Sequence, residues 1–312
     1  MKIIDQNLLH TLKTSACVLA LAGTLMVPSL ASYAEDKADL SLEANAQVEQ
    51  DTQDQTAEKR KEIIAEAVSA LSETRSALKA LDEEKTKDAL SALEKATGKL
   101  EIILARDPSL ALAPTGVRTE TYDIIGSLND INKIKKDAKS LLGDDKVQAA
   151  RHLLSGLASE AVIKTTNIPL ATYPDAIKKA VKLIDEDKIN EAKAVLQTAL
   201  NTLVVTQKII PLPVVVAESL LDDAEKLAEN EERTEEESER LSDLLGAAET
   251  EIQLAQALGY GEKKDFEDFY KEIKTIRSKS FDGKSGLGFF EQIRSFMESM
   301  TLFSQPEKQN NN

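Results

Sequence analysis

The chain has 312 residues, with 54 Asp and Glu against 39 Lys and Arg, so its formal net charge is −15. A charge of this sign repels nucleic acids and anionic lipid surfaces. No basic patch with interleaved aromatic residues occurs in the sequence, so nucleic-acid binding is excluded and membrane binding is not expected. The one cysteine, Cys17, cannot form a disulfide within the chain or a thiolate metal site by itself.

Residues 1–34 have the pattern of a cleaved secretory signal peptide. Two lysines precede an apolar run over residues 16–30, and Ser32 and Ala34 place small side chains at the −3 and −1 positions of a cleavage site. The run is interrupted by Pro28 and is shorter than the roughly 20 residues that cross a bilayer. We therefore predict export with cleavage after Ala34, and no membrane anchor.

Residues 35–57 are polar and acidic, and we interpret them as a disordered leader, because they hold too few apolar side chains to offset the entropy of ordering. From residue 58 to residue 277, Ala, Leu, Glu and Lys dominate and apolar residues recur at helical spacing. We predict an all-α domain there, built from antiparallel helical hairpins that stack as tetratricopeptide repeats do.

An internal repeat supports this architecture. Its three copies align on Lys85, Lys146 and Lys188, which are 61 and 42 residues apart. Equivalent positions hold the same types of residue: an apolar residue four before the lysine (Leu81, Leu142, Ile184), alanine four after it (Ala89, Ala150, Ala192), leucine eight after it (Leu93, Leu154, Leu196) and proline 23 after it (Pro108, Pro169, Pro211).

Each copy predicts one hairpin. The acidic turn before the lysine should cap the second helix and meet the positive end of its dipole. The alanine lets the two helices approach, the leucine fills the seam, and the proline ends the second helix and begins an extended linker. The extended segments, residues 107–119, 165–174 and 207–213, are expected at one end of the stack. A longer hairpin without the lysine follows, with a capping box that begins at Thr234.

Four separated stretches of the chain resemble the YfdX family of bacterial proteins. They are ATGKLEIILARDPSLALAP (96–114), ARHLLSGLASEAVIKTTNIPLATYP (150–174), LNTLVVTQKIIPLPVVVAESLLDDAEKLAE (200–229) and AQALGYGEKKDF (255–266). The resemblance covers residues 58–277. It implies an all-helical periplasmic protein of Gram-negative bacteria that is associated with acid resistance and with drug and other stress responses. It implies no catalytic residues.

Few residues offer the chemistry of a functional site. We interpret His152 as a structural side chain near the packing stripe, with a proton-responsive site as the alternative. Tyr122, Tyr173 and Tyr260 lie next to predicted linkers or helix ends, where such rings often contact ligands or partners; packing under loops is the alternative. The sequence has no phosphate-binding glycine loop, calcium loop or catalytic-triad motif. We expect no catalytic site, no metal and no cofactor.

The composition changes near the C-terminus. Residues 278–288 form a Gly/Ser linker, residues 289–303 predict an amphipathic helix, and residues 304–312 are a polar tail. The apolar face of the predicted helix carries Phe289, Phe290, Ile293, Phe296, Met297, Met300 and Phe303. We expect this face to dock on the chain's own hairpins, with a partner or a second copy as the alternative, and a membrane surface as a weaker one.

Taken as a whole, the sequence favours a non-enzymatic periplasmic stress-response binding protein that forms homo-oligomers. Its expected partners are unfolded proteins, which would make it chaperone-like, or amphipathic small molecules that it would sequester. A structural scaffold that docks a specific partner is the alternative, and a cell-wall hydrolase is a third and weaker one.

The mature chain is expected to begin at Glu35, because Ser32 and Ala34 fit the specificity of signal cleavage. Mass spectrometry of the protein purified from its native host measures this terminus. A purified protein that keeps Met1 would contradict export through a cleaved signal.

Overall fold

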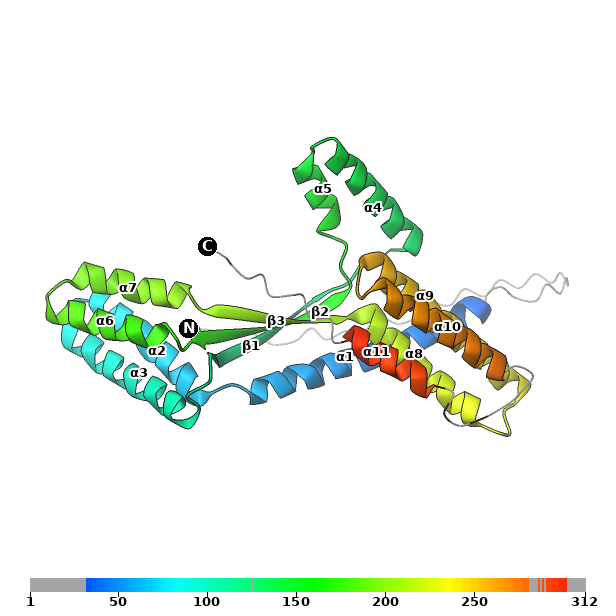
Figure 1. Cartoon of the computed structure of the whole chain (residues 1–312), viewed down its shortest axis with the longest axis horizontal. Coiled ribbons are helices and arrows are strands. Elements are labelled where there is room, and N and C mark those ends of the chain that lie inside the picture. Colours follow the sequence, from blue (N-terminus) through cyan, green and yellow to red (C-terminus); the bar gives the residue numbers. More distant parts are fainter. Residues whose placement is uncertain (1–31, 125, 281–285, 287, 289, 302–312) are drawn as a thin grey trace, which may run out of the picture. The chain divides into compact units, whose positions relative to one another are not determined.

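The computed structural model describes residues 32–124, 126–280, 286, 288 and 290–301 (Figure 1). Over these residues the chain is mostly helical, as the sequence predicts, with one small sheet. None of the described helices combines the length and hydropathy needed to span a membrane. The elements in chain order are α1 (Ser32–Lys61), α2 (Ala65–Asp82), α3 (Thr86–Arg106), β1 (Leu112–Tyr122), α4 (Leu128–Gly143), α5 (Val147–Leu154), β2 (Glu160–Pro169), α6 (Tyr173–Asp185), α7 (Ile189–Asn201), β3 (Val204–Pro211), α8 (Leu212–Glu229), α9 (Glu235–Leu258), α10 (Lys263–Ser280) and α11 (Glu291–Thr301).

The three copies of the repeat form the same local structure. The acidic residue before each lysine adopts the left-handed backbone conformation, with φ of 59° at Glu84, 58° at Asp145 and 59° at Asp187. In each copy the lysine N–H donates to the carbonyl five residues earlier, at an N–O distance of 2.8 Å. This bond and the left-handed residue are the marks of a Schellman motif, which satisfies the last carbonyls of the first helix. The predicted hairpins are therefore one supersecondary unit used three times.

The acidic turns do not cap the second helices as predicted. The lysine is the N-cap residue in all three hairpins, and no side-chain capping bond is formed there. The carboxylates pair with the lysines instead, at N–O distances of 2.7 Å for Glu83, 3.3 Å for Asp144 and 2.8 Å for Glu186. The residue in the left-handed conformation ends the first helix of the hairpin. The carboxylate two positions before the lysine therefore lies beside the ammonium group of that lysine, and not at the first turn of the second helix.

The extended segments are strands, which the repeat pattern did not predict. They form an antiparallel sheet in the order β1-β2-β3. In the second and third copies the helices end at Leu154 and Asn201, well before the prolines, and Pro169 and Pro211 are the last residues of β2 and β3. Pairing the segments satisfies backbone groups that an unpaired linker would leave to solvent.

Two of the repeat hairpins pack against each other. Leu112 of β1 pairs with Pro169 of β2, so hairpin α2/α3 before β1 and hairpin α6/α7 after β2 join the same end of the sheet. Helix α2 contacts α7, and α3 contacts α6. The four helices share one core, which includes Leu81, Leu93 and Leu196. The stacking that the sequence predicts is thus confirmed for the first and third hairpins.

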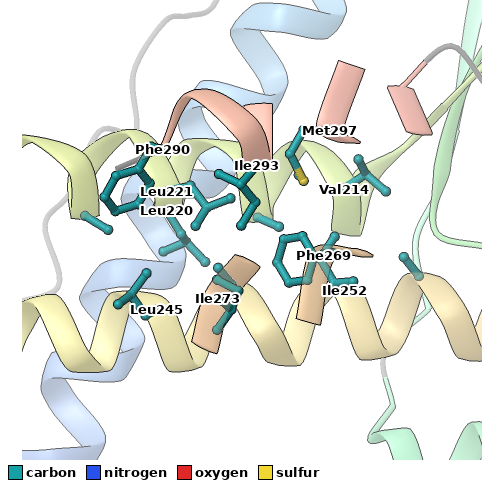
Figure 2. Packing of buried hydrophobic residues seen from close by; sticks show 14 of the residues in the cluster. Val214, Leu220, Leu221, Leu245, Ile252, Phe269, Ile273, Phe290, Ile293 and Met297 are labelled. Carbon is teal, nitrogen blue, oxygen red and sulfur yellow. The ribbon is translucent and has the colours of Figure 1, made fainter. Parts of the chain in front are cut away.

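Helices α8, α9, α10 and α11 share a second core, and Figure 2 shows its packing. Phe290, Ile293 and Met297 are each 1% exposed or less within it, and Phe296 packs against it half-buried. The structure therefore places the apolar face of the C-terminal helix on the chain's own helices. Phe289, Phe303, the side chain of Met300 and the tail 304–312 lie outside the described residues, as does most of the predicted linker.

Helix α1 occupies the segment whose composition indicated a disordered leader, residues 35–57. Two side-chain hydrogen bonds at (i, i+4) spacing support the helix, from Gln47 to Asp51 at 3.0 Å and from Gln50 to Asp54 at 3.2 Å. Most of the predicted signal peptide lies outside the described residues. By its contacts the chain divides into residues 1–38 and residues 39–312, and all contacts described below belong to the second unit.

The leucine eight residues after the lysine was predicted to fill equivalent seams, and this is wrong for Leu154. Leu93 and Leu196 are fully buried, whereas Leu154 is 41% exposed, because no second hairpin covers α4/α5 within the described chain. We expect Leu93→Ala and Leu196→Ala each to lower the free energy of unfolding by about 2–5 kcal/mol. Ile102→Ala, at a side chain that is 41% exposed on α3, is the control and should cost about 0.5 kcal/mol. Urea unfolding measures all three, and equal losses would contradict the burial difference.

Candidate functional site

Helix α1 is fixed to the sheet at three places. Val48 is buried in a cluster with aliphatic side chains of β2, β3 and α8. The hydroxyls of Thr56 and Thr119 form a hydrogen bond of 2.8 Å. Just beyond the helix, the N–H of Ile64 donates to the carbonyl of Pro114 at 3.0 Å. Between the first two of these contacts the helix and the sheet leave an open space.

This space is a cavity of about 910 Å³. Pockets that bind small molecules commonly have volumes of roughly 300–1,000 Å³, so the cavity can accept a ligand of that class. Its lining comes from one face of α1, the end of β1, the residues that follow β1, and the start of α8: Val48, Glu49, Thr52, Gln53, Asp54, Thr56, Ala57, Arg60, Thr119, Thr121, Asp123 and Leu212.

The cavity lining combines three kinds of side chain. Glu49, Asp54 and Asp123 carry negative charge, against the single cation Arg60. Four threonines and a glutamine supply neutral hydrogen-bonding groups, while valine, alanine and leucine supply apolar surface. An apolar ligand body with a positive charge matches such a lining in both charge and polarity.

Asp123 also belongs to a partly buried polar network at the start of β2. The hydroxyl of Ser159 donates to Asp123 at 2.8 Å. The hydroxyl of Tyr260 accepts from the Ser159 N–H at 3.0 Å and donates to the carboxylate of Glu160 at 2.8 Å. The network therefore connects the cavity wall to β2 and to the loop that follows α9.

Glu251 of α9 lies close enough to this network for its charge to interact with that of Asp123. Burial, and then the negative charge of Asp123, raise the pKa of Glu251 to about 7. Burial also raises the pKa of Tyr260 above its ordinary value, so its hydroxyl stays protonated and able to donate. Glu251 thus takes up a proton near neutral pH, far above the ordinary range of a glutamate.

The three tyrosines singled out in the sequence lie in three different environments. Tyr260 is buried in the polar network. Tyr122 is 46% exposed and donates to the carboxylate of Glu120 at 2.7 Å. Tyr173 is buried in the core of helices α2, α3, α6 and α7, and its hydroxyl has no hydrogen-bond partner among the described residues. Tyr260 is thus linked to the cavity through Ser159 and Asp123, and Tyr122 lies between the lining residues Thr121 and Asp123, whereas Tyr173 belongs to a separate core.

His152, interpreted from the sequence as a structural side chain near the packing stripe, is exposed in the last turn of α5. Helix α5 has only eight residues, and Ala150 is its one buried side chain, so most of its surface faces solvent. Among the described residues, no group of three or more His, Cys, Asp or Glu side chains is arranged to hold a metal ion.

Sequence reasoning missed the cavity and the polar network. The cavity depends on α1 lying against a sheet, and neither that helix nor the sheet was predicted. The polar network depends on the start of β2 meeting α9 and the loop that follows it. The alternation of Val117, Thr119 and Thr121 has the period of a strand and was the one available signal. No signal connects Ser159 with Tyr260, which are 101 residues apart.

The fold and the site define a mostly helical protein in which repeated hairpins are joined by a three-stranded sheet. Residues 70–209 match the family model described as "YfdX protein", and this part of the chain belongs to the YfdX family. The match runs from α2 almost to the end of β3. It leaves out α1, helices α8 to α11, and the resembling stretch at 255–266.

One solved structure with similarity to the chain is that of YfdX from Salmonella Typhi, in one of its crystal forms. It is 15% identical, the match covers 48% of this chain and 93% of that one, and the TM-score is 0.34. A likeness at this level supports no structural argument. No curated protein shows significant sequence similarity to the chain.

Replacing Glu251 by glutamine is expected to stabilise the fold at high pH only. The pKa of Glu251 is raised from 4.5 to about 7, so the folded state holds the proton more tightly than the unfolded state does. Its ionisation therefore destabilises the fold as pH rises through this interval. We expect Glu251→Gln to raise the free energy of unfolding by about 1–3 kcal/mol at pH 8 and to have little effect at pH 4.

Urea unfolding at the two pH values measures this difference. Glu239→Gln, at an exposed position of the same helix, is the control and should show no such pH dependence. An equal effect of Glu251→Gln at pH 8 and pH 4 would contradict the raised pKa.

Proposed function

We propose that this protein is an exported, periplasmic stress-response binding protein that sequesters amphipathic small molecules in the cavity between α1 and β1. The observation that carries the proposal is the cavity itself, with its volume of about 910 Å³ and its lining of mixed polarity. The signal-like N-terminus supports the location, and the membership of residues 70–209 in the YfdX family agrees with it.

The residues of the cavity suit binding better than catalysis. Its lining includes hydroxyl, amide and carboxylate groups, and none of the lining residues is a histidine, cysteine or lysine. The hydroxyls of Thr56 and Thr119 are already bonded to each other. A hydroxyl nucleophile needs an adjacent base to be activated, and within the described chain the hydroxyl of Thr56 bonds to the carbonyl of Thr52 and to Thr119, not to a carboxylate. A non-enzymatic role therefore fits this site.

The charges of the lining indicate the class of ligand. With Glu49, Asp54 and Asp123 against Arg60, the cavity is net negative and draws cations from solution. Ala57 and the exposed edges of Val48 and Leu212 supply apolar surface for the rest of the same molecule. We therefore propose cationic amphipathic molecules, in which a protonated or quaternary amine is joined to an apolar body.

Two probes with the same apolar tail and opposite charge test this directly. Below their critical micelle concentrations, dodecyltrimethylammonium should bind more tightly than dodecyl sulfate in a calorimetric titration. Glu49→Gln with Asp54→Asn should weaken binding of the cation about tenfold, which corresponds to about 1.4 kcal/mol. Asp88→Asn with Glu94→Gln, two exposed positions on α3 away from the cavity, is the matched control.

Equal binding of the two probes would contradict a cation-selective cavity. The same contradiction would follow if the control pair weakened binding as much as the cavity pair. Binding of neither probe to the purified protein would remove the support for sequestration of small amphipathic cations.

A further inference from the structure

The three hairpins of the repeat can be compared position by position, because they share one closing motif. The alanine four residues after the lysine is fully buried in every copy, at Ala89, Ala150 and Ala192. The alanine eight residues before the lysine is at most 1% exposed in every copy as well, at Ala77, Ala138 and Ala180. These small side chains lie in the seam between the two helices of a hairpin, and each hairpin closes that seam by itself.

The large apolar positions behave differently. Four residues before the lysine, Leu81 is 2% exposed and Ile184 is 4% exposed, but Leu142 is 48% exposed. Eight residues after the lysine, the second copy is again the exception. Its Leu154 is 41% exposed, whereas the equivalent leucines of the first and third copies are fully buried. A hairpin therefore buries its alanines alone and needs a second hairpin to bury its leucines.

The first and third hairpins show how such a face is covered. Helix α2 contacts α7 and α3 contacts α6, so the first helix of each hairpin lies against the second helix of the other. This crossed pairing is what an approximate twofold axis between two like hairpins produces. An ion pair between Asp82 and Lys193 connects α2 to α7.

The second hairpin, α4/α5, has no such neighbour among the described residues. Its most extensive contact with another described element is between α4 and α9, where the Lys135 ammonium donates to the carbonyl of Ala257. Leu142, Val147 and Leu154 remain 48%, 55% and 41% exposed. The residue equivalent to Val147 in the third copy is Ile189, which packs against the core of the internal bundle.

We propose that hairpin α4/α5 of one molecule packs against hairpin α4/α5 of a second copy of this chain. The product is an intermolecular four-helix bundle with the arrangement of the internal one, in which α4 of each molecule lies on α5 of the other. Because both hairpins then have the same sequence, the approximate twofold of the internal bundle becomes a true twofold, and the interface is isologous.

The charges of the hairpin oppose this occupant less than those of the rest of the chain. Two copies of a chain with a net charge of −15 repel each other over most of their surface. The hairpin has six basic residues against four acidic ones: Lys133, Lys135, Lys136, Lys139, Lys146 and Arg151 against Asp130, Asp137, Asp144 and Asp145. Its small net positive charge gives no attraction between two copies, so the proposed contact rests on the burial of apolar side chains. Arg151 is the equivalent of Lys193, but the equivalent of Asp82 is Gly143, so the ion pair of the internal bundle has no direct counterpart.

Sedimentation velocity on the purified protein tests the proposal. The wild-type protein at tens of micromolar is expected to be a dimer or a multiple of a dimer. Leu142→Glu with Leu154→Glu should halve the mass, with an unchanged circular dichroism spectrum. Val68→Glu with Ile102→Glu is the matched control, because both side chains are 41% exposed on the outside of the internal bundle. It should leave the mass unchanged.

A second variant keeps the test decisive if the glutamate pair fails to fold. In a Cys17→Ser background, Leu154→Cys should form a disulfide-linked dimer on mild oxidation, because the twofold brings position 154 of both copies into one core. Ile102→Cys should not. A monomeric wild type, an unchanged mass in the Leu142 and Leu154 variant, or equal cross-linking at positions 102 and 154 would each overturn the proposal.

Discussion

The pairing of β2 with both β1 and β3 is the constraint on which the rest of the structure depends. Each core of the protein includes a side chain of this strand: Val162 in the core of α8 to α11, Ile163 in the cluster beneath α1, and Ile168 in the core of the stacked hairpins. The same pairing brings the first and third hairpins to one end of the sheet. Without it, two like hairpins whose equivalent lysines, Lys85 and Lys188, are 103 residues apart in sequence would have no reason to meet.

The candidate site is a consequence of this sheet. Because α1 contacts the strands through a few side chains such as Val48 and Thr56, the remaining face of the helix and the end of β1 enclose a cavity instead of a packed core. Asp123 lies on the wall of that cavity and also accepts a hydrogen bond from Ser159. Through Asp123 the cavity is electrostatically coupled to Glu251, a carboxyl that titrates near neutral pH.

The repeat shows how one local sequence pattern acquires different roles. All three copies close with a left-handed acidic residue and a lysine, and all bury the alanines of the seam. Whether the leucines are buried depends on the neighbour that each hairpin meets. Two copies meet each other and complete a core, while the third leaves Leu142 and Leu154 at the surface, where the proposed contact with a second copy would bury them.

Local information in the sequence was sufficient for the helices of the hairpins, the hairpin repeat, the capping box at Thr234 and the apolar face of the C-terminal helix, because these depend on residues a few positions apart. Only the tertiary structure decided that the extended segments pair, that α1 lies on the sheet and that Asp123, Ser159 and Tyr260 meet. Strand pairing, burial and a shifted pKa arise from groups far apart in the chain, and a single sequence carries no local signal of which distant groups will become neighbours.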